Sequence, residues 1–266
     1  MSRGTPQDAE LTRRRNLRLL GVLGVLAALV VLAIVTGGSE ETGGGGGNGG
    51  GDSRPAAACG AETPPEADPQ SYDAPDEVIS EGVDYGAVIQ TSCGSIEIDL
   101  LEDRAPENVN AFVFLAREGF YDGLTFHRVE QNSVLQSGDP NGQNGEPPDG
   151  PGFTLPDELP GKANEYVYGI VGMANSGQPN SGGSQFFIVI HKNRPAGYQP
   201  FYSIFGEVTG GSFDGAEDDV GCNPSDEGVQ TLEIIGCQRT QGGNDPVEAV
   251  KPVVPVFIEG IEITES

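Results

Sequence analysis

Hydrophobic and polar positions divide the chain into an apolar N-terminal run, a glycine-rich stretch and a long region of short patterned segments. Over Tyr85–Leu101, apolar and polar residues alternate on both sides of Cys93-Gly94, which predicts a β-hairpin. The spacing then becomes helical after Pro106, a residue suited to the first turn of a helix, and Gly119 can end that helix. The pattern therefore predicts a strand pair followed by one helix.

Short apolar segments separated by turns continue to the C-terminus. The strands expected there are Leu124–Val129, Val134–Asp139, Tyr166–Asn175, Ser184–Ile190 and Tyr202–Val208. We expect a second short helix at Val229–Ile235, and a strand pair or one bent strand over Val253–Glu265. Many short strands favour a mainly β domain, a barrel or a sandwich, and a closed barrel would leave no exposed strand edges.

The apolar run Leu19–Val35 contains no charged residue and follows five arginines in the first 18 residues. With Thr36 and Gly37 it is just long enough to cross a bilayer core as a helix. We expect a single uncleaved transmembrane anchor over 19–36, with the basic tail 1–18 in the cytoplasm and the rest of the chain outside the cell membrane. A cleaved signal peptide is the main alternative, and a buried core helix is another.

Glycine and proline dominate the segment 37–75, which includes the nine-residue tract Gly43–Gly51. Such a composition offers few side chains to bury, so we expect a disordered linker that tethers a folded domain over 76–266.

The chain carries a formal net charge of -26, from 40 acidic and 14 basic residues. This balance argues against a nucleic-acid partner, because phosphate binding needs a basic face. Two histidines and four cysteines argue against a zinc ribbon or a histidine-rich metal centre. The acidic segment Gly211–Gly228 is either a solvated loop or a Ca²⁺ site at Asp214, Glu217, Asp218 and Asp219, although the spacing fits no EF-hand.

The four cysteines allow three pairings in an oxidising compartment. We favour Cys222 with Cys237, because they close a short acidic segment, and this choice leaves Cys59 to pair with Cys93. Free buried thiols are the alternative.

Five fragments stand out by their order and spacing within Tyr85–Thr264. They are Phe126-His127-Arg128, Gln136-Ser137-Gly138-Asp139, Met173-Ala174-Asn175, Ser184-Gln185-Phe186-Phe187 and Phe205-Gly206-Glu207-Val208. Together they closely resemble the cyclophilin family of peptidyl-prolyl cis/trans isomerases. The resemblance implies a closed eight-stranded antiparallel barrel capped by two α-helices, with a site on its outer face. It also implies proline-containing polypeptide substrates and no metal or cofactor. With the expected anchor, the chain looks like a bacterial, membrane-anchored member that assists the folding of extracytoplasmic proteins.

The resemblance implies Arg128 as the catalytic residue, although composition alone favours a surface ion pair for it. The substrate-binding positions that it implies are Val134, Gln136, Ala174, Asn175, Gln185, Phe187, Tyr198 and Tyr202. Within this set, Gln136 would hold the arginine, Ala174 and Asn175 would bind the backbone before the proline, and Val134 and Phe187 would line the proline pocket. Phe126 and Phe186 are expected in the core, since strand alternation places them on the opposite face, and Met173 is expected there too. His127 is expected to be structural, since rotation of an amide needs no proton transfer.

Two departures from the family pattern bear on activity. Ser133 stands where the family usually has an aromatic residue, after the unusual Glu130-Gln131-Asn132. The tryptophan linked to tight cyclosporin binding is absent near Gly197, so weak binding of that drug is expected. The main alternative to an active isomerase is therefore a cyclophilin-like module that binds proline-containing segments with little turnover. A hydrolase has no supporting motif.

Overall fold

The computed structural model describes residues 57–63, 66–68, 70–141, 150–192, 199–213, 229–244 and 248–266. The chain divides into two units, Met1–Gly51 and Asp52–Ser266, and every described residue belongs to the second. The expected anchor over 19–36 lies outside the described residues. In the described ranges, no helix is long and apolar enough to cross a membrane.

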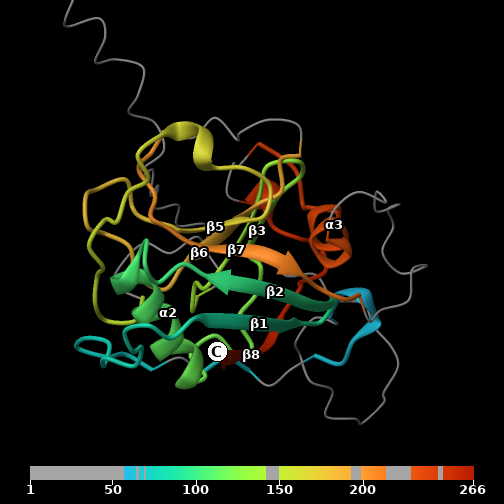
Figure 1. Cartoon of the computed structure of the whole chain (residues 1–266). Helices are drawn as coiled ribbons and strands as arrows, with labels where there is room; N and C mark the ends of the chain where they lie inside the picture. Colours follow the sequence, from blue (N-terminus) through green and yellow to red (C-terminus); the bar gives the residue numbers. More distant parts are fainter. Residues whose placement is uncertain are drawn as a thin grey trace, which may run out of the picture. The chain divides into compact units, whose positions relative to one another are not determined.

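Eight antiparallel strands form one curled sheet in the order β3-β4-β6-β5-β7-β2-β1-β8 (Figure 1). The strands are β1 (Tyr85–Thr91), β2 (Gly94–Leu100), β3 (Arg128–Glu130), β4 (Val134–Ser137), β5 (Ile170–Met173), β6 (Phe186–Val189), β7 (Ile204–Gly210) and β8 (Ile258–Glu265). The expected hairpin is confirmed as β1 and β2, and each of the five segments expected to form strands overlaps one, although β3 and β7 extend beyond the predicted bounds. The C-terminal segment forms the single strand β8.

The sheet is a curled half-barrel, so the prediction of a closed barrel is wrong. β3 and β8 are the edge strands. The segment just before β3 and the segment just before β8 are joined by the isolated bridge between Thr125 and Phe257. Beside this bridge, Phe126 N donates to Val256 O at 2.9 Å. Closure would need a longer ladder, but β3 has only three residues and β8 pairs along β1 instead.

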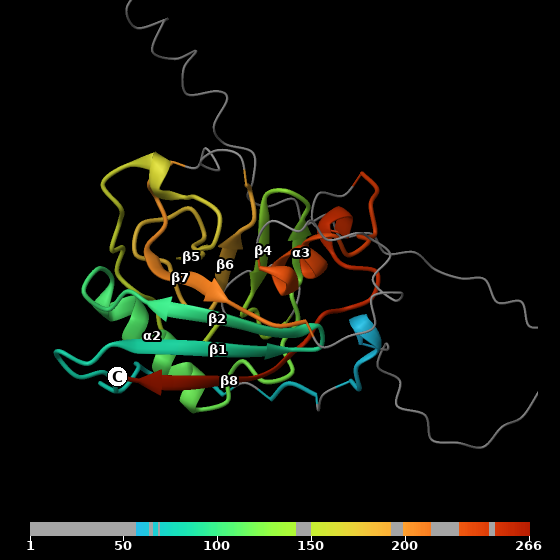
Figure 2. The same ribbon diagram turned by 45° about the vertical axis from the view of Figure 1, so that its right-hand side comes forward.

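The helices α2 (Pro106–Arg117) and α3 (Gln230–Gly236) lie at opposite ends of the curled sheet in both views (Figures 1 and 2). α2 packs against β8 and β7, whereas α3 packs against β2, β3 and β4. Pro106 occupies the expected first turn of α2. The helix ends as expected near Gly119, whose φ of 70° lets the chain turn sharply while Phe120 N donates to Leu115 O at 3.0 Å. The residues that the structure describes also form the short 3₁₀ helices η1 (Ala58–Gly60), η2 (Ala163–Glu165) and η4 (Glu248–Val250).

The main core fills the hollow of the sheet and takes in the apolar faces of both helices. At its centre the Phe112 ring of α2 lies 5.7 Å from Phe186 and 5.2 Å from Phe205, measured between ring centroids. Phe126, Met173 and Phe186 are buried in this core, which confirms their expected structural placement.

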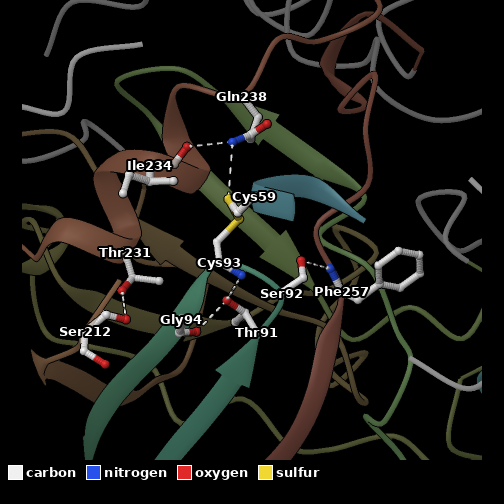
Figure 3. The surroundings of a disulfide bond; sticks show 10 residues. All are labelled: Cys59, Thr91, Ser92, Cys93, Gly94, Ser212, Thr231, Ile234, Gln238 and Phe257. Carbon is white, nitrogen blue, oxygen red and sulfur yellow. Dashed lines mark hydrogen bonds between the residues drawn. A yellow bond between two sulfur atoms is a disulfide. The ribbon is translucent and has the colours of Figure 1, made fainter. Parts of the chain in front are cut away.

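A disulfide joins Cys59 to Cys93, which lies in the turn between β1 and β2 (Figure 3). The Cα atoms are 5.2 Å apart, and the pairing expected from the sequence is confirmed. Cys237 is also disulfide-bonded, so the free-thiol alternative is wrong for the described cysteines. Its expected partner, Cys222, lies outside the described residues, as do the acidic residues 214–219.

The described part of the segment 57–75 packs on the domain, although its composition suggested a linker. Ala58 N donates to Pro255 O at 2.9 Å, and Tyr72 N donates to Pro151 O at 2.7 Å. The Tyr72 ring also meets Phe114 of α2 edge-on, with centroids 4.9 Å apart. The packed region therefore begins ahead of residue 76, at about the position of the disulfide.

Candidate active site

Strand register brings four residues that are distant in sequence into one row across the sheet. Arg128 of β3 lies opposite Gln136 of β4, which lies opposite Phe187 of β6, which in turn lies opposite Gly172 of β5. The neighbouring row, formed by Val129, Leu135, Ile188 and Val171, is buried in the main core. Since successive side chains of a strand point to opposite faces, the Arg128 row lies on the outer face of the sheet.

A chain of hydrogen bonds runs along this outer row. Arg128 Nη1 donates to Gln136 Oε1 at 3.2 Å, and Gln136 Nε2 donates to Gln185 Oε1 at 2.8 Å. On its other side, Arg128 Nη2 donates to Glu130 Oε2 at 2.6 Å. The Arg128 side chain is 37% exposed. The arginine therefore forms the surface ion pair that composition favours and also presents its guanidinium to solvent beside the implied glutamines.

A second apolar cluster lies on the outer face, separate from the main core. It comprises Val134, Tyr166, Ile170, Phe187, Val189 and Ile204, with Leu101, Ala174 and Tyr202 packed against it. Four residues of the implied substrate site are among these nine. The Phe187 and Tyr202 rings meet edge-on with their centroids 5.3 Å apart. An apolar surface of aromatic rings next to a guanidinium suits a proline ring whose amide faces the arginine.

Tyr166 fixes the position of Tyr202 within this cluster. Its hydroxyl donates to Tyr202 O at 2.7 Å and accepts from Tyr202 N at 3.1 Å. Burial raises the pKa of Tyr166 to about 12, so the hydroxyl keeps the proton that it donates. The buried Tyr166 side chain thus holds the main chain of the segment that carries Tyr202.

The loop after β5 is held against β6 and the same Tyr202 segment. Ala174 N donates to Gln185 O at 2.9 Å. The Asn175 side chain is engaged at both ends, because its Nδ2 donates to Phe201 O at 2.7 Å and its Oδ1 accepts from Gly177 N at 3.0 Å. A peptide bound here would therefore meet the main chain of Asn175 more readily than its amide.

The structure thus gathers Arg128, Val134, Gln136, Ala174, Asn175, Gln185, Phe187 and Tyr202 on one face, while Tyr198 lies outside the described residues. Ser133 ends the tight turn between β3 and β4, where its N donates to Glu130 O at 2.9 Å. Sequence reasoning missed three contributors to the site, namely Glu130, Tyr166 and Gly172. A glycine inside an apolar strand was the available signal for Gly172, and Glu130 stands two residues from Arg128, hence on the same face.

His127 lies next to Arg128 but is only 2% exposed. Burial lowers the pKa of its imidazole to about 4, and the nearby Arg128 acts in the same direction, while Asp139 opposes them. The ring is therefore neutral at neutral pH. Among the described residues, no group of three or more His, Cys, Asp or Glu side chains is placed to hold a metal ion.

Comparison with known proteins identifies the family. The family model described as "Cyclophilin type peptidyl-prolyl cis-trans isomerase/CLD" matches residues 87–218. Peptidyl-prolyl cis-trans isomerase B of Bacillus subtilis is 44% identical over 116 residues, which cover 44% of this chain and 77% of that protein. A putative peptidyl-prolyl cis-trans isomerase of Staphylococcus epidermidis is 37% identical over 190 residues, which cover 67% of this chain and 91% of the relative.

A solved structure agrees with these relatives. The cyclophilin-type peptidyl-prolyl cis-trans isomerase of Cryptosporidium parvum, crystallised in the presence of the dipeptide Ala-Pro, matches with a TM-score of 0.51 and 26% identity. The match covers 68% of this chain and 99% of that one. The chain belongs to the cyclophilin-type peptidyl-prolyl cis-trans isomerases.

Replacing Gly172 by alanine is expected to damage the site through Phe187. A Cβ atom at this position would lie 2.4 Å from Phe187 Cζ, so the ring would have to move away. Overpacking of this kind costs about 1–3 kcal/mol of strain, which the displaced Phe187 ring relieves by leaving its place in the pocket. A loss of about 1.4 kcal/mol in binding of the transition state lowers kcat/KM tenfold. We therefore expect kcat/KM for an X–Pro peptide to fall about tenfold. The matched control is Gly150→Ala, since a Cβ there meets nothing within 4 Å. Equal activity of the two variants would contradict the prediction.

His127 is expected to make the fold less stable in acid. Its pKa is about 4 in the folded chain and about 6.5 in the unfolded one. The unfolded chain therefore binds more protons below about pH 6.5, and stability falls as the pH falls towards 4. The contribution lost amounts to about 3 kcal/mol. We expect the difference in free energy of unfolding between wild type and His127→Gln to shrink by that amount from pH 7 to pH 4. Parallel stability profiles from denaturant titrations would show the prediction to be wrong.

Proposed function

We propose that this chain catalyses the cis/trans isomerisation of X–Pro bonds on the outer face of β3, β4 and β6, with Arg128 as the catalytic residue. The observation that carries the proposal is the bond from the Arg128 guanidinium to Gln136, which stands opposite Phe187 of the apolar cluster that also contains Val134 and Tyr202. One side of the site offers hydrogen-bond donors, which suit the amide of an X–Pro segment. The other side offers an apolar surface, which suits the proline ring.

Rotation of the amide needs no covalent chemistry. The barrier of about 18–20 kcal/mol is the resonance of the C–N bond, and uncatalysed isomerisation takes tens to hundreds of seconds. A donor near the proline nitrogen favours the pyramidal form of that nitrogen and so weakens the resonance. If Arg128 donates more strongly to the twisted amide than to either planar form, the barrier falls. Arginine suits this task because its guanidinium stays charged and its donors are rigidly arranged.

The remaining residues orient the peptide. In the proposed complex the proline ring lies on Phe187, Val134 and Tyr202, and the backbone before the proline pairs with the main chain of Ala174 and Asn175. Gln136 links Arg128 to Gln185, because its side chain accepts from the arginine and donates to Gln185, whose main chain is bonded to Ala174.

We further propose that the enzyme works outside the cell membrane, as a membrane-anchored bacterial isomerase that assists the folding of extracytoplasmic proteins. The proposal is supported by the apolar run Leu19–Val35 behind an arginine cluster and by the glycine-rich tract Gly43–Gly51. The Cys59–Cys93 disulfide adds support, because disulfides persist mainly in oxidising compartments.

A second candidate function is binding without efficient turnover. The observation that favours it is the polar Ser133, which replaces an aromatic residue next to the pocket residue Val134. A polar floor would hold a proline ring less firmly. The retained arginine and its glutamine partners favour the enzyme.

Removing the guanidinium decides between the two candidates. We expect Arg128→Ala to lower the rate of X–Pro isomerisation about 100-fold or more, as removal of one preorganised donor does in other enzymes. The rate is measured by NMR exchange on a short X–Pro peptide with the full chain. The control is Arg239→Ala, which removes an exposed arginine from outside the site. Equally slow exchange with wild type and Arg128→Ala would support the binding module and contradict the proposal that the chain is an active isomerase.

Cyclosporin is expected to inhibit this protein only weakly. The family's tryptophan is absent, and Gly197 stands near its position, outside the described residues. Titration calorimetry with the wild-type chain tests the expectation. A dissociation constant in the low-nanomolar range would contradict it.

A further inference from the structure

Glu130 lies next to both the catalytic arginine and Val134, one residue of the proposed proline pocket. It lies two residues after Arg128 on β3, so both side chains project from the outer face. Across the ladder it stands opposite Val134, a member of the apolar cluster. Its carboxylate forms the 2.6 Å ion pair with Arg128 Nη2, and its side chain is 44% exposed. An acidic residue here therefore touches the group on which the proposed reaction depends.

The guanidinium of Arg128 is held at both of its terminal nitrogens. Nη1 donates to Gln136, and Nη2 donates to Glu130. Gln136 is itself fixed by its bond to Gln185, just ahead of β6. With partners on both sides, the planar group can neither rotate about its own axis nor swing away from the sheet without breaking a charge-assisted bond.

We propose that Glu130 is a positioning residue for isomerisation, which sets the orientation of the Arg128 guanidinium before the peptide binds. The inference rests on the proposed function of Arg128. Arginine has five N–H donors, and the bonds to Gln136 and Glu130 use one on each terminal nitrogen, so the guanidinium can be held in place and still donate to a substrate. A long side chain that is already oriented loses less conformational freedom when the transition state forms.

The opposite role for Glu130 would be competition, in which the carboxylate occupies the donors that the substrate needs. The geometry favours positioning, because Glu130 and the proposed peptide-binding residues contact different ends of the guanidinium. Glu130 accepts from Nη2, whereas Nη1 donates to Gln136, which is linked through Gln185 to Ala174. The two roles predict opposite changes in rate, so kinetics separates them.

The test compares kcat and KM of the full-length wild type with those of Glu130→Ala and Glu130→Gln. The matched control is Glu262→Ala, which removes an exposed glutamate from β8. For Glu130→Ala we expect kcat to fall about three- to fivefold with KM unchanged, a ratio at the upper end of what an exposed ion pair supplies. Glu130→Gln should retain part of the rate, since its amide oxygen can accept the same N–H. Glu262→Ala should behave as wild type.

Salt supplies a second readout that a purely structural role would not move. Raising NaCl from about 0.05 M to about 1 M shortens the screening length from above 10 Å to about 3 Å and weakens an exposed pair. The wild-type kcat should fall towards that of Glu130→Ala, whose own rate should stay nearly constant. Parallel salt profiles would overturn the proposal.

NMR of the Arg128 side chain observes the positioning directly and does not depend on turnover. Rotation of the guanidinium about the Nε–Cζ bond should be slow in wild type and faster in Glu130→Ala. Equal rotation rates, or a higher kcat/KM in Glu130→Ala, would overturn the proposal. If wild type itself fails to speed isomerisation, the proposed function of the site fails, whereas the rotation rates still report on the ion pair. Should Glu130→Ala fold poorly, the near-isosteric Glu130→Gln carries the same comparison.

Discussion

The register of β3, β4, β6 and β5 is the constraint on which the site depends. It places Arg128, Gln136, Phe187 and Gly172 in one row, while the adjacent row of Val129, Leu135, Ile188 and Val171 enters the core. A shift of one residue would turn the apolar row to solvent and the arginine into the core, at a large cost in burial. The same packing that stabilises the sheet therefore fixes which side chains face the substrate.

The outer face reconciles two interpretations of Arg128 that seemed to exclude each other. In a chain with 40 acidic and 14 basic residues, an arginine on the surface is expected to pair with a carboxylate, and it does so with Glu130. The pairing leaves other donors of the same group available. An acidic side chain of the site thus supplies the counter-charge of the arginine.

Features that depend on residues close together in the sequence were predictable, whereas features that depend on contacts between distant segments were not. The β1–β2 hairpin and α2 depend on local alternation, Pro106 and Gly119, and both were predictable. Most of the site was found through short motifs. Closure of the barrel was not predictable in this way, because it depends on how far the edge strands β3 and β8 extend at the opposite ends of the sheet order. The bonds from Tyr166 to Tyr202 join residues 36 positions apart in the sequence, and no local pattern predicts them.

The disulfide between Cys59 and Cys93 determines how the domain responds to a mechanical load on the chain ahead of it. Tension along that chain reaches Cys59 and passes through the sulfur–sulfur bond into the turn between β1 and β2. The intervening stretch 60–92, which includes β1, is bypassed and cannot be peeled from its neighbours β2 and β8 one hydrogen bond at a time. The strands that carry Arg128 and Gln136 lie at the other edge of the sheet. A pull on the N-terminal side therefore enters the fold far, in strand order, from the site.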